Sequence, residues 1–281
     1  MPTKAALRTG TFARRIKKLW RRTAKVWRRV RRWWRPAPRP AKFIMAALAA
    51  LILWLGINWI YQVVRKPSEL FFPVSGTLYK SPAETWAGYA PIFKRFSTTV
   101  MTPDFLAAIA QVEGSGNPVA RTYWRWSWTS QPFEVYRPAS SAVGMYQITD
   151  GNFAEARRYC IHDHVVVADG PWNDWHSCWF NSLYARVLPG DAVELTSAYL
   201  DRSVASILER RHLTATSLLH KQRLAALIHL CGAGAGDEFA RRGFKFAEGQ
   251  RCGDTSARVY VERVQAMRGV FTRLDNASAH P

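Results

Sequence analysis

Glu113 is the carboxylic acid of this sequence best placed for acid–base chemistry. It falls in the last turn of an apolar helix predicted to begin at Thr102, Pro103 and Asp104, and the run GSGNP at 114–118 follows it directly. Core packing on one side and an open turn on the other would desolvate the carboxyl, and desolvation raises the pKa of a carboxylic acid. Such a carboxyl would be a usable general acid near neutral pH, although the residues alone do not establish this role. The alternative is a solvated glutamate at a helix end.

Four cysteines form the second group of reactive side chains. An even number of cysteines in an oxidising compartment indicates two disulfides, and the pairings Cys160–Cys178 and Cys231–Cys252 each close one irregular segment. Buried free thiols are the alternative. A zinc site is another, built from Cys160, Cys178, His162, His164 and His176, but their spacing matches no common zinc template. We expect neither a metal nor a cofactor.

The elements that carry these residues are predicted to be mainly helical. Ser81, Pro82 and Glu84 have the types and order of a capping box with proline at the first helical position. Few segments alternate with period two, so 115–148 and 160–190 are predicted to be irregular. Further helices are predicted from Thr102 to Gly114, Asp150 to Tyr159, Asp191 to about Arg210, Thr216 onward, and Asp254 to about Leu274. The resulting domain spans 81–275, with a short tail at 276–281.

An uncharged run at 43–64 predicts a membrane anchor. Its 22 residues span roughly 33 Å as a helix, enough to cross a bilayer core. Sixteen Lys and Arg precede the run and two follow it, so the N-terminus is expected in the cytoplasm and the domain in the periplasm. Residues 65–80, with two prolines and a glycine, are predicted to form a stalk. A cleaved signal peptide and a buried core helix are the alternatives.

Most of the net charge of +20 comes from the first 42 residues, which contribute +16, and little of it from the domain. Residues 67–281 hold 22 basic and 20 acidic side chains. In the basic tail, apolar residues recur every three or four positions up to Pro36, which predicts an amphipathic helix on the anionic lipids of the inner membrane. An unstructured topology signal and a nucleic-acid or protein contact are alternatives, and nucleic-acid binding is not expected.

Several motifs together resemble one enzyme family. The sequence VEGSGNP at 112–118 resembles the E-S-G-G-N-P signature of the soluble-lytic-transglycosylase domain. SAVGMYQI at 141–148 looks like its A-x-G-L-M-Q-I motif, SAYL at 197–200 like its G-x-x-Y-L helix, and Tyr260-Val261 lies where a late Y-V commonly falls. These motifs cover roughly residues 101–265 in the family's order.

The resemblance implies a lysozyme-like domain of the α+β superfamily that acts on peptidoglycan. Glu113 would be its only catalytic carboxyl. It would protonate the MurNAc–GlcNAc glycosidic oxygen and then act as base toward the sugar's C6 hydroxyl, giving a 1,6-anhydro-MurNAc end. Protein partners in an envelope complex are also expected. The substrate-binding residues would be Ser115, Tyr146, Gln147, Tyr199 and Tyr260.

Departures from the family pattern keep other functions open. Gly114 replaces the family's serine, Tyr146 stands where methionine is commoner, and CGAGAG at 231–236 lacks the Tyr and Asn of the Y-N-A-G-x-G motif. One alternative is a hydrolytic muramidase that uses Glu134 or Asp150 as a second carboxylate. Another is a peptidoglycan-binding scaffold without turnover.

Two further features of the sequence have more than one interpretation. The aromatic segment YWRWSW at 123–128 suits either a glycan subsite or core packing. His229, on an apolar helix, is predicted to be a packed residue and not a ligand.

Overall fold

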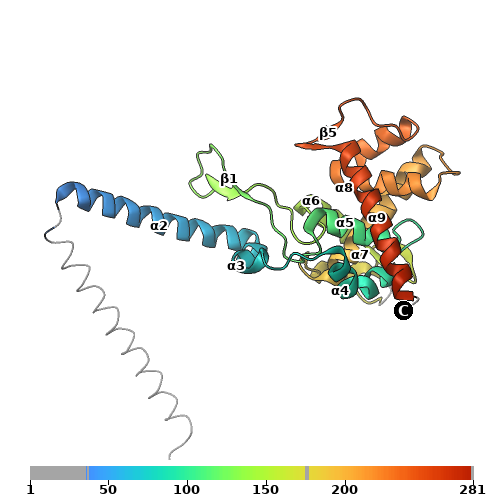
Figure 1. Cartoon of the computed structure of the whole chain (residues 1–281), viewed down its shortest axis with the longest axis horizontal. Coiled ribbons are helices and arrows are strands. Elements are labelled where there is room, and N and C mark those ends of the chain that lie inside the picture. Colours follow the sequence, from blue (N-terminus) through green and yellow to red (C-terminus); the bar gives the residue numbers. More distant parts are fainter. Residues whose placement is uncertain (1–35, 37, 175–176, 280–281) are drawn as a thin grey trace, which may run out of the picture. The chain divides into compact units, whose positions relative to one another are not determined.

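The computed structural model describes residues 36, 38–174 and 177–279. The chain forms two units, residues 1–61 and residues 62–281 (Figure 1). The predicted amphipathic helix at 1–35 lies outside the described residues.

Helix α2 (Arg39–Arg65) confirms that the uncharged run forms a continuous helix. It begins four residues before the predicted start, and its 27 residues correspond to about 40 Å. Among the described helices it is the only one both long enough and apolar enough to cross a membrane.

The segment after α2 is folded, whereas the sequence predicted a stalk over 65–80. It forms a 3₁₀ turn η1 (Pro67–Phe71) and a short helix α3 (Phe72–Ser75). Glu69 in η1 is fully buried, and the Ser75 carbonyl accepts a hydrogen bond of 2.6 Å from Asn117 Nδ2. The second unit accordingly begins at residue 62 and not at 81.

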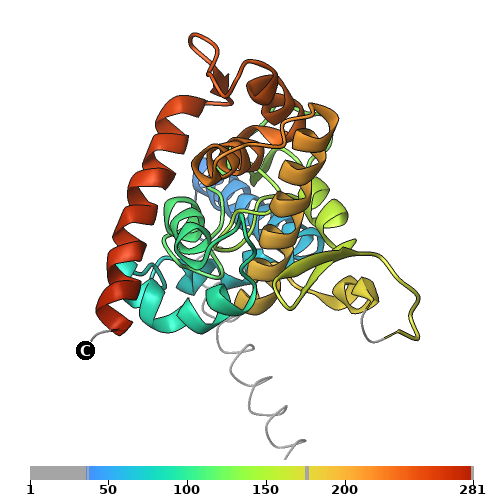
Figure 2. The same ribbon diagram turned by 90° about the vertical axis from the view of Figure 1, so that its right-hand side faces the viewer.

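The second unit is mainly helical, as predicted, and α5 lies at its centre. Every side chain from Phe105 to Ala110 in α5 is fully buried. Helix α5 packs against α4 and α9, and α7 packs against α8; Figure 2 shows α9, in red, along one side. The bounds are α4 (Pro82–Arg95), α5 (Pro103–Gly114), α6 (Asp150–Ala156), α7 (Pro189–Arg210), α8 (Leu218–Arg241) and α9 (Ala257–Ala279). The finer prediction, a lysozyme-like fold, stays a prediction.

Local signals account for most helix starts. The predicted capping box is present: the Ser81 hydroxyl accepts from Glu84 N and the Glu84 carboxylate accepts from Ser81 N. Helix α6 is capped by the Thr149 hydroxyl, one residue before the predicted Asp150. It ends at Ala156 and not at Tyr159, because Tyr159 begins a strand.

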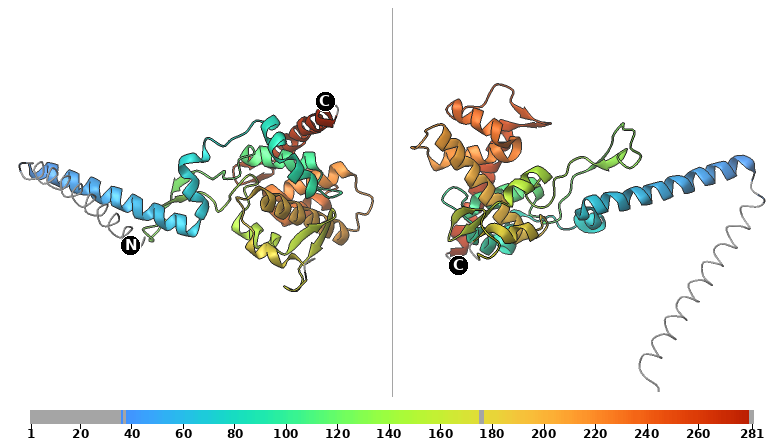
Figure 3. Two further views of the ribbon diagram at one scale, coloured as in Figure 1. Left: turned by 90° about the horizontal axis from the view of Figure 1, so that it is seen from below. Right: turned by 180° about the vertical axis from the view of Figure 1, so that it is seen from behind.

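Three small antiparallel hairpins lie in segments that lacked a strand pattern (Figure 3). Their strands have only two to four residues, too few for a period of two to stand out. A 3₁₀ turn, η2 (Cys178–Leu183), follows the second hairpin. The pairs are β1 (Trp124–Trp126) with β2 (Tyr136–Pro138), β3 (Tyr159–His162) with β4 (Val165–Ala168), and β5 (Arg251–Cys252) with β6 (Thr255–Ser256).

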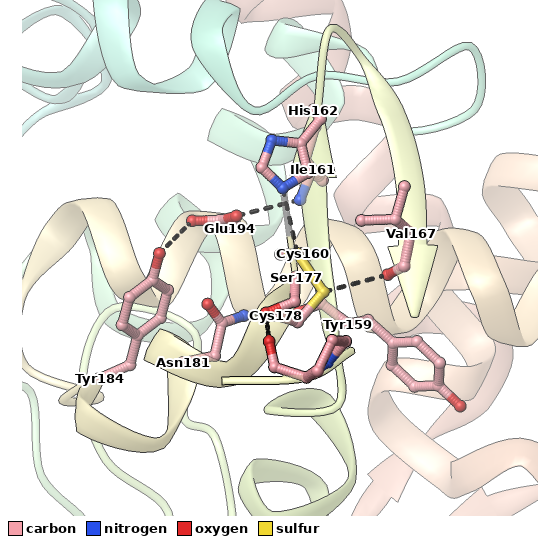
Figure 4. The surroundings of a disulfide bond; sticks show 11 residues. Tyr159, Cys160, Ile161, His162, Val167, Ser177, Cys178, Asn181, Tyr184 and Glu194 are labelled. Atoms are coloured by element: carbon pink, nitrogen blue, oxygen red, sulfur yellow. Dashed lines mark hydrogen bonds between the residues drawn. A yellow bond between two sulfur atoms is a disulfide. The ribbon is translucent and has the colours of Figure 1, made fainter. Parts of the chain in front are cut away.

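Both predicted cysteine pairs are at disulfide distance. Cys160–Cys178 joins β3 to η2 and Cys231–Cys252 joins α8 to β5, with Cα–Cα distances of 5.3 and 5.4 Å. Figure 4 shows the first pair beside buried Glu194, whose carboxylate accepts from Ile161 N at 3.0 Å. The described residues contain no group of three metal-ligating side chains. His176 lies outside the described residues.

Candidate active site

Glu113 ends the central helix with its carboxylate next to two polar side chains. Tyr260 on α9 donates a hydrogen bond of 2.5 Å to Glu113 Oε1, and His229 Nε2 on α8 lies 3.5 Å from the same oxygen. No residue in the described part of the chain bonds Oε2 of Glu113. Since the Glu113 side chain keeps 17 % of its surface exposed, this second oxygen is available to a ligand.

The pKa of Glu113 is lowered, which corrects the expectation of a raised value. Desolvation does raise the pKa, but the hydrogen bonds and charges around the carboxylate outweigh it. His229 contributes most to the lowering, followed by the Tyr260 hydroxyl and the charge of Arg263. Without a ligand, Glu113 is therefore a carboxylate at neutral pH.

Tyr260 is a fixed donor to this carboxylate. Its side chain is buried in α9, and burial together with the charge of Glu113 raises its pKa well above the ordinary value. The hydroxyl consequently stays protonated at physiological pH. The position predicted from the motifs to bind substrate thus contacts Glu113 directly.

His229 is the site residue that the sequence interpretation missed. It lies one helical turn before the glycine-rich run of α8, and its side chain is only 8 % exposed, as a packed histidine would be. Its Nε2 nevertheless faces Glu113. A histidine among apolar neighbours gives no sequence signal that separates these two roles, because both need a buried helix face.

The two leading motifs are in backbone contact. A Cβ on Gly114 would lie 2.8 Å from Met145 Cα and 2.9 Å from the Met145 carbonyl oxygen. Serine, which the family carries after its glutamate, does not fit this approach without a shift of the backbone. Gly114 is therefore a steric requirement of this chain.

Tyr146 does not line a cleft, contrary to its predicted role. Its side chain is fully buried, it donates a hydrogen bond of 3.1 Å to the Leu106 carbonyl, and burial raises its pKa. Gln147 is half-buried in a left-handed conformation with φ of 47°. Its amide donates to the Gly144 carbonyl at 2.8 Å and the Ala120 carbonyl at 3.2 Å, so it braces the loop after Glu113.

Ser115 lies next to Glu113 and is half-buried. It caps α5 in a left-handed conformation with φ of 48°. Its carbonyl accepts a hydrogen bond of 2.9 Å from Lys80 N. Its hydroxyl forms no hydrogen bond within the described part of the chain. Ser115 therefore stays a candidate for contacting substrate.

Tyr199 borders two pockets, and His229 borders the smaller of them. A small pocket is bordered by His229, Asn152 and Tyr199, and a larger one of about 450 Å³ shares Asn152 and Tyr199. The larger pocket is polar and is also bordered by Glu155, Arg202 and Arg210 on α6 and α7. Tyr199 therefore borders both pockets, and its role in substrate binding stays a prediction.

The glycine-rich run at 231–236 borders the same pocket. Gly232 has φ of 83° and ψ of 169°, which interrupts the helical geometry of α8 at a conformation that favours glycine. The next residue, Ala233, lines the larger pocket, and Cys231 ties the break to Cys252. Ala233 is thus the residue of this run that reaches the pocket wall.

The two predicted candidates for a second carboxylate are engaged in ion pairs. Glu134 pairs with Arg65 and Arg137, and Asp150 pairs with Arg186 at 2.8 Å. Glu155 was not predicted, yet it is the exposed carboxylate that borders the larger pocket. Of the three carboxylates, Glu155 is the one that borders the pocket lined by Tyr199.

No protein-family model matches this chain, and none of the curated proteins matches it significantly.

Proposed function

We propose that this chain is a membrane-anchored lytic transglycosylase that cleaves the MurNAc–GlcNAc bond of peptidoglycan. The observation that carries the proposal is Glu113, held through one oxygen by Tyr260 and His229 with the other oxygen available. The order and spacing of the motifs around Glu113, Tyr199 and Tyr260 agree with it.

In the proposed reaction Glu113 acts first as acid and then as base. Its proton passes to the glycosidic oxygen as the bond to the MurNAc C1 breaks, and GlcNAc leaves with a hydroxyl. The Glu113 carboxylate then takes the proton of the MurNAc C6 hydroxyl as that oxygen bonds to C1. Tyr260 and His229 stabilise the carboxylate of the second step, while desolvation by a bound glycan would favour the protonated form for the first.

Cleavage of purified peptidoglycan by the full chain in detergent tests the role of Glu113. Glu113→Gln should lower the rate by about two orders of magnitude or more, because the amide has no acidic proton to transfer. Glu248→Gln, an exposed control, should leave the rate unchanged. Full activity of Glu113→Gln would exclude Glu113 as the catalytic carboxyl.

A hydrolytic muramidase is the second candidate, and the place of Glu155 at the larger pocket is what favours it. A hydrolase needs a second carboxylate to activate water or attack the sugar. Under that function Glu155→Gln would abolish cleavage, whereas the transglycosylase proposal expects cleavage to continue. A scaffold without turnover would release no fragments from either protein.

The proposed location is the bacterial inner membrane, with α2 as the anchor. The charge asymmetry around α2 favours a cytoplasmic N-terminus and a periplasmic domain, and two cysteine pairs suit an oxidising compartment. We further propose that residues 1–64 contact anionic lipids and that envelope proteins are partners. A periplasm-specific reporter fused after Pro281 should be active, and a reporter active only in the cytoplasm would contradict this topology.

A further inference from the structure

The β1–β2 hairpin presents aromatic side chains to solvent. Figures 1 and 3 show it extending away from helices α4 to α9. Tyr123 is 69 %, Trp126 65 % and Trp128 fully exposed, so core packing, one of the two interpretations of this segment, does not apply to them. Large exposed apolar side chains gathered at one place mark an interaction surface.

The aromatic residues form a ladder along one face of the hairpin. Trp126 is the cross-strand partner of Tyr136, with ring centroids 4.7 Å apart, and Trp124 lies two residues earlier on the same face. Trp124 Nε1 donates a hydrogen bond of 2.8 Å to the Glu69 carboxylate in the segment that follows α2. The ladder therefore begins at Trp124, beside the segment that follows α2, and ends at the fully exposed Trp128.

The outer loop of the hairpin is bonded to the last turn of α2. Gln62 Nε2 donates a hydrogen bond of 2.6 Å to the Phe133 carbonyl, and Arg65 forms an ion pair with Glu134. Lys66 Nζ donates a hydrogen bond of 3.1 Å to the carbonyl of Ser140, two residues after the end of β2. If α2 crosses a bilayer, its last turn lies at the membrane surface, and these bonds bring the loop to the same level.

The charges on the hairpin suit an anionic surface. Residues 122–133 contain no acid, and Arg125 is exposed on β1. The next acid along the chain, Glu134, is neutralised by Arg65 and by Arg137 at 2.9 Å. Nothing on the exposed part of the loop would repel lipid phosphate groups.

We infer that Trp126 and Trp128 insert into the headgroup region of the bilayer that α2 crosses, giving the domain a second membrane contact. The inference rests on the proposed anchoring by α2. Tryptophan favours this interface because its ring is apolar while its N–H remains hydrogen-bonded. A contact of this kind restricts rotation of the domain about the single helix and fixes the height of Glu113 above the membrane. The bonds to Gln62 and Arg65 favour lipid over glycan as the occupant.

A fluorescent probe on the loop tests this inference in the full chain. Since all four native cysteines are paired, Ser130→Cys gives one labelling site beside the tryptophans, and Val259→Cys on α9 gives an exposed control. The labelled proteins are reconstituted into vesicles of phosphatidylethanolamine and phosphatidylglycerol that carry a headgroup nitroxide. Flotation after alkaline extraction confirms that α2 is inserted.

The expected result is quenching at position 130 that exceeds quenching at position 259 by at least about threefold. Replacing Trp126 and Trp128 with alanine in the Ser130→Cys chain should remove most of this difference. Equal quenching at the two positions, or failure of the chain to insert, would overturn the inference. A response to added glycan fragments without lipid quenching would assign the hairpin to substrate instead. Peptidoglycan cleavage by the same vesicles is measured separately, so a failed enzyme proposal is recognised independently of a failed membrane contact.

Discussion

Replacing Gly114 with alanine should destabilise the domain, because this glycine lets the backbone after Glu113 touch the backbone at Met145. The added Cβ would meet three backbone atoms of Met145 at 2.8 to 3.1 Å. Backbone atoms cannot rotate away as a flexible side chain can, so one helix or loop must move. Overpacking of this kind costs about 1–3 kcal/mol, and contacts this close to backbone favour the upper end, about 3 kcal/mol.

Thermal unfolding of the full chain in detergent measures this cost. For a domain of this size, 3 kcal/mol lowers the Tm by about 6–12 °C. Gly190→Ala is the matched control, because that glycine lies in the first turn of α7 with nothing within 4 Å of its Cβ position. The control should leave the Tm unchanged or slightly raised. If Gly114→Ala unfolds at the wild-type temperature, the tight approach of the two motifs is refuted.

Three further predictions concern the site and its supports. His229→Asn removes the main cause of the lowered Glu113 pKa, so Glu113 stays protonated to higher pH and the basic limb of the kcat/KM–pH profile should move upward; an unmoved limb contradicts this. Glu69→Gln removes the charge of the buried carboxylate that Lys66 and Arg121 share, so the Tm should fall by about 10 °C, whereas Glu238→Gln, in a surface ion pair, should change it little. Double alanine substitution of Cys231–Cys252, which are 21 residues apart, should lower stability by about 3 kcal/mol in chemical denaturation; an unchanged midpoint would argue against the bridge.

The helices were predictable because their signals are local. The capping box at Ser81 and Glu84 and the apolar face of α5 each depend on a few consecutive residues. The folded segment at 65–80 was not predictable from its prolines and glycine. Its order depends on Glu69, whose partner Arg121 is 52 residues away.

The residues of the candidate site also differ in whether a local sequence signal marks them. Glu113 is marked by its own helix end, and Tyr260 was found only through the motif order. The lowered pKa of Glu113 depends on donors from α8 and α9 that no local pattern shows. Tyr146 was misassigned because a motif position does not reveal which way its side chain points. The Tyr146 side chain points into the core, where its hydroxyl donates to the Leu106 carbonyl.

The chemistry of the released glycan ends tests the central proposal most directly. Wild-type protein is incubated with purified peptidoglycan, and the soluble fragments are analysed by mass spectrometry without prior reduction. The proposal predicts 1,6-anhydro-MurNAc ends, about 18 mass units lighter than hydrolysed ends, because the sugar's own hydroxyl replaces water. These ends should be absent with Glu113→Gln. Fragments that carry only hydrolysed reducing ends would contradict the proposed transglycosylase and point to a hydrolase.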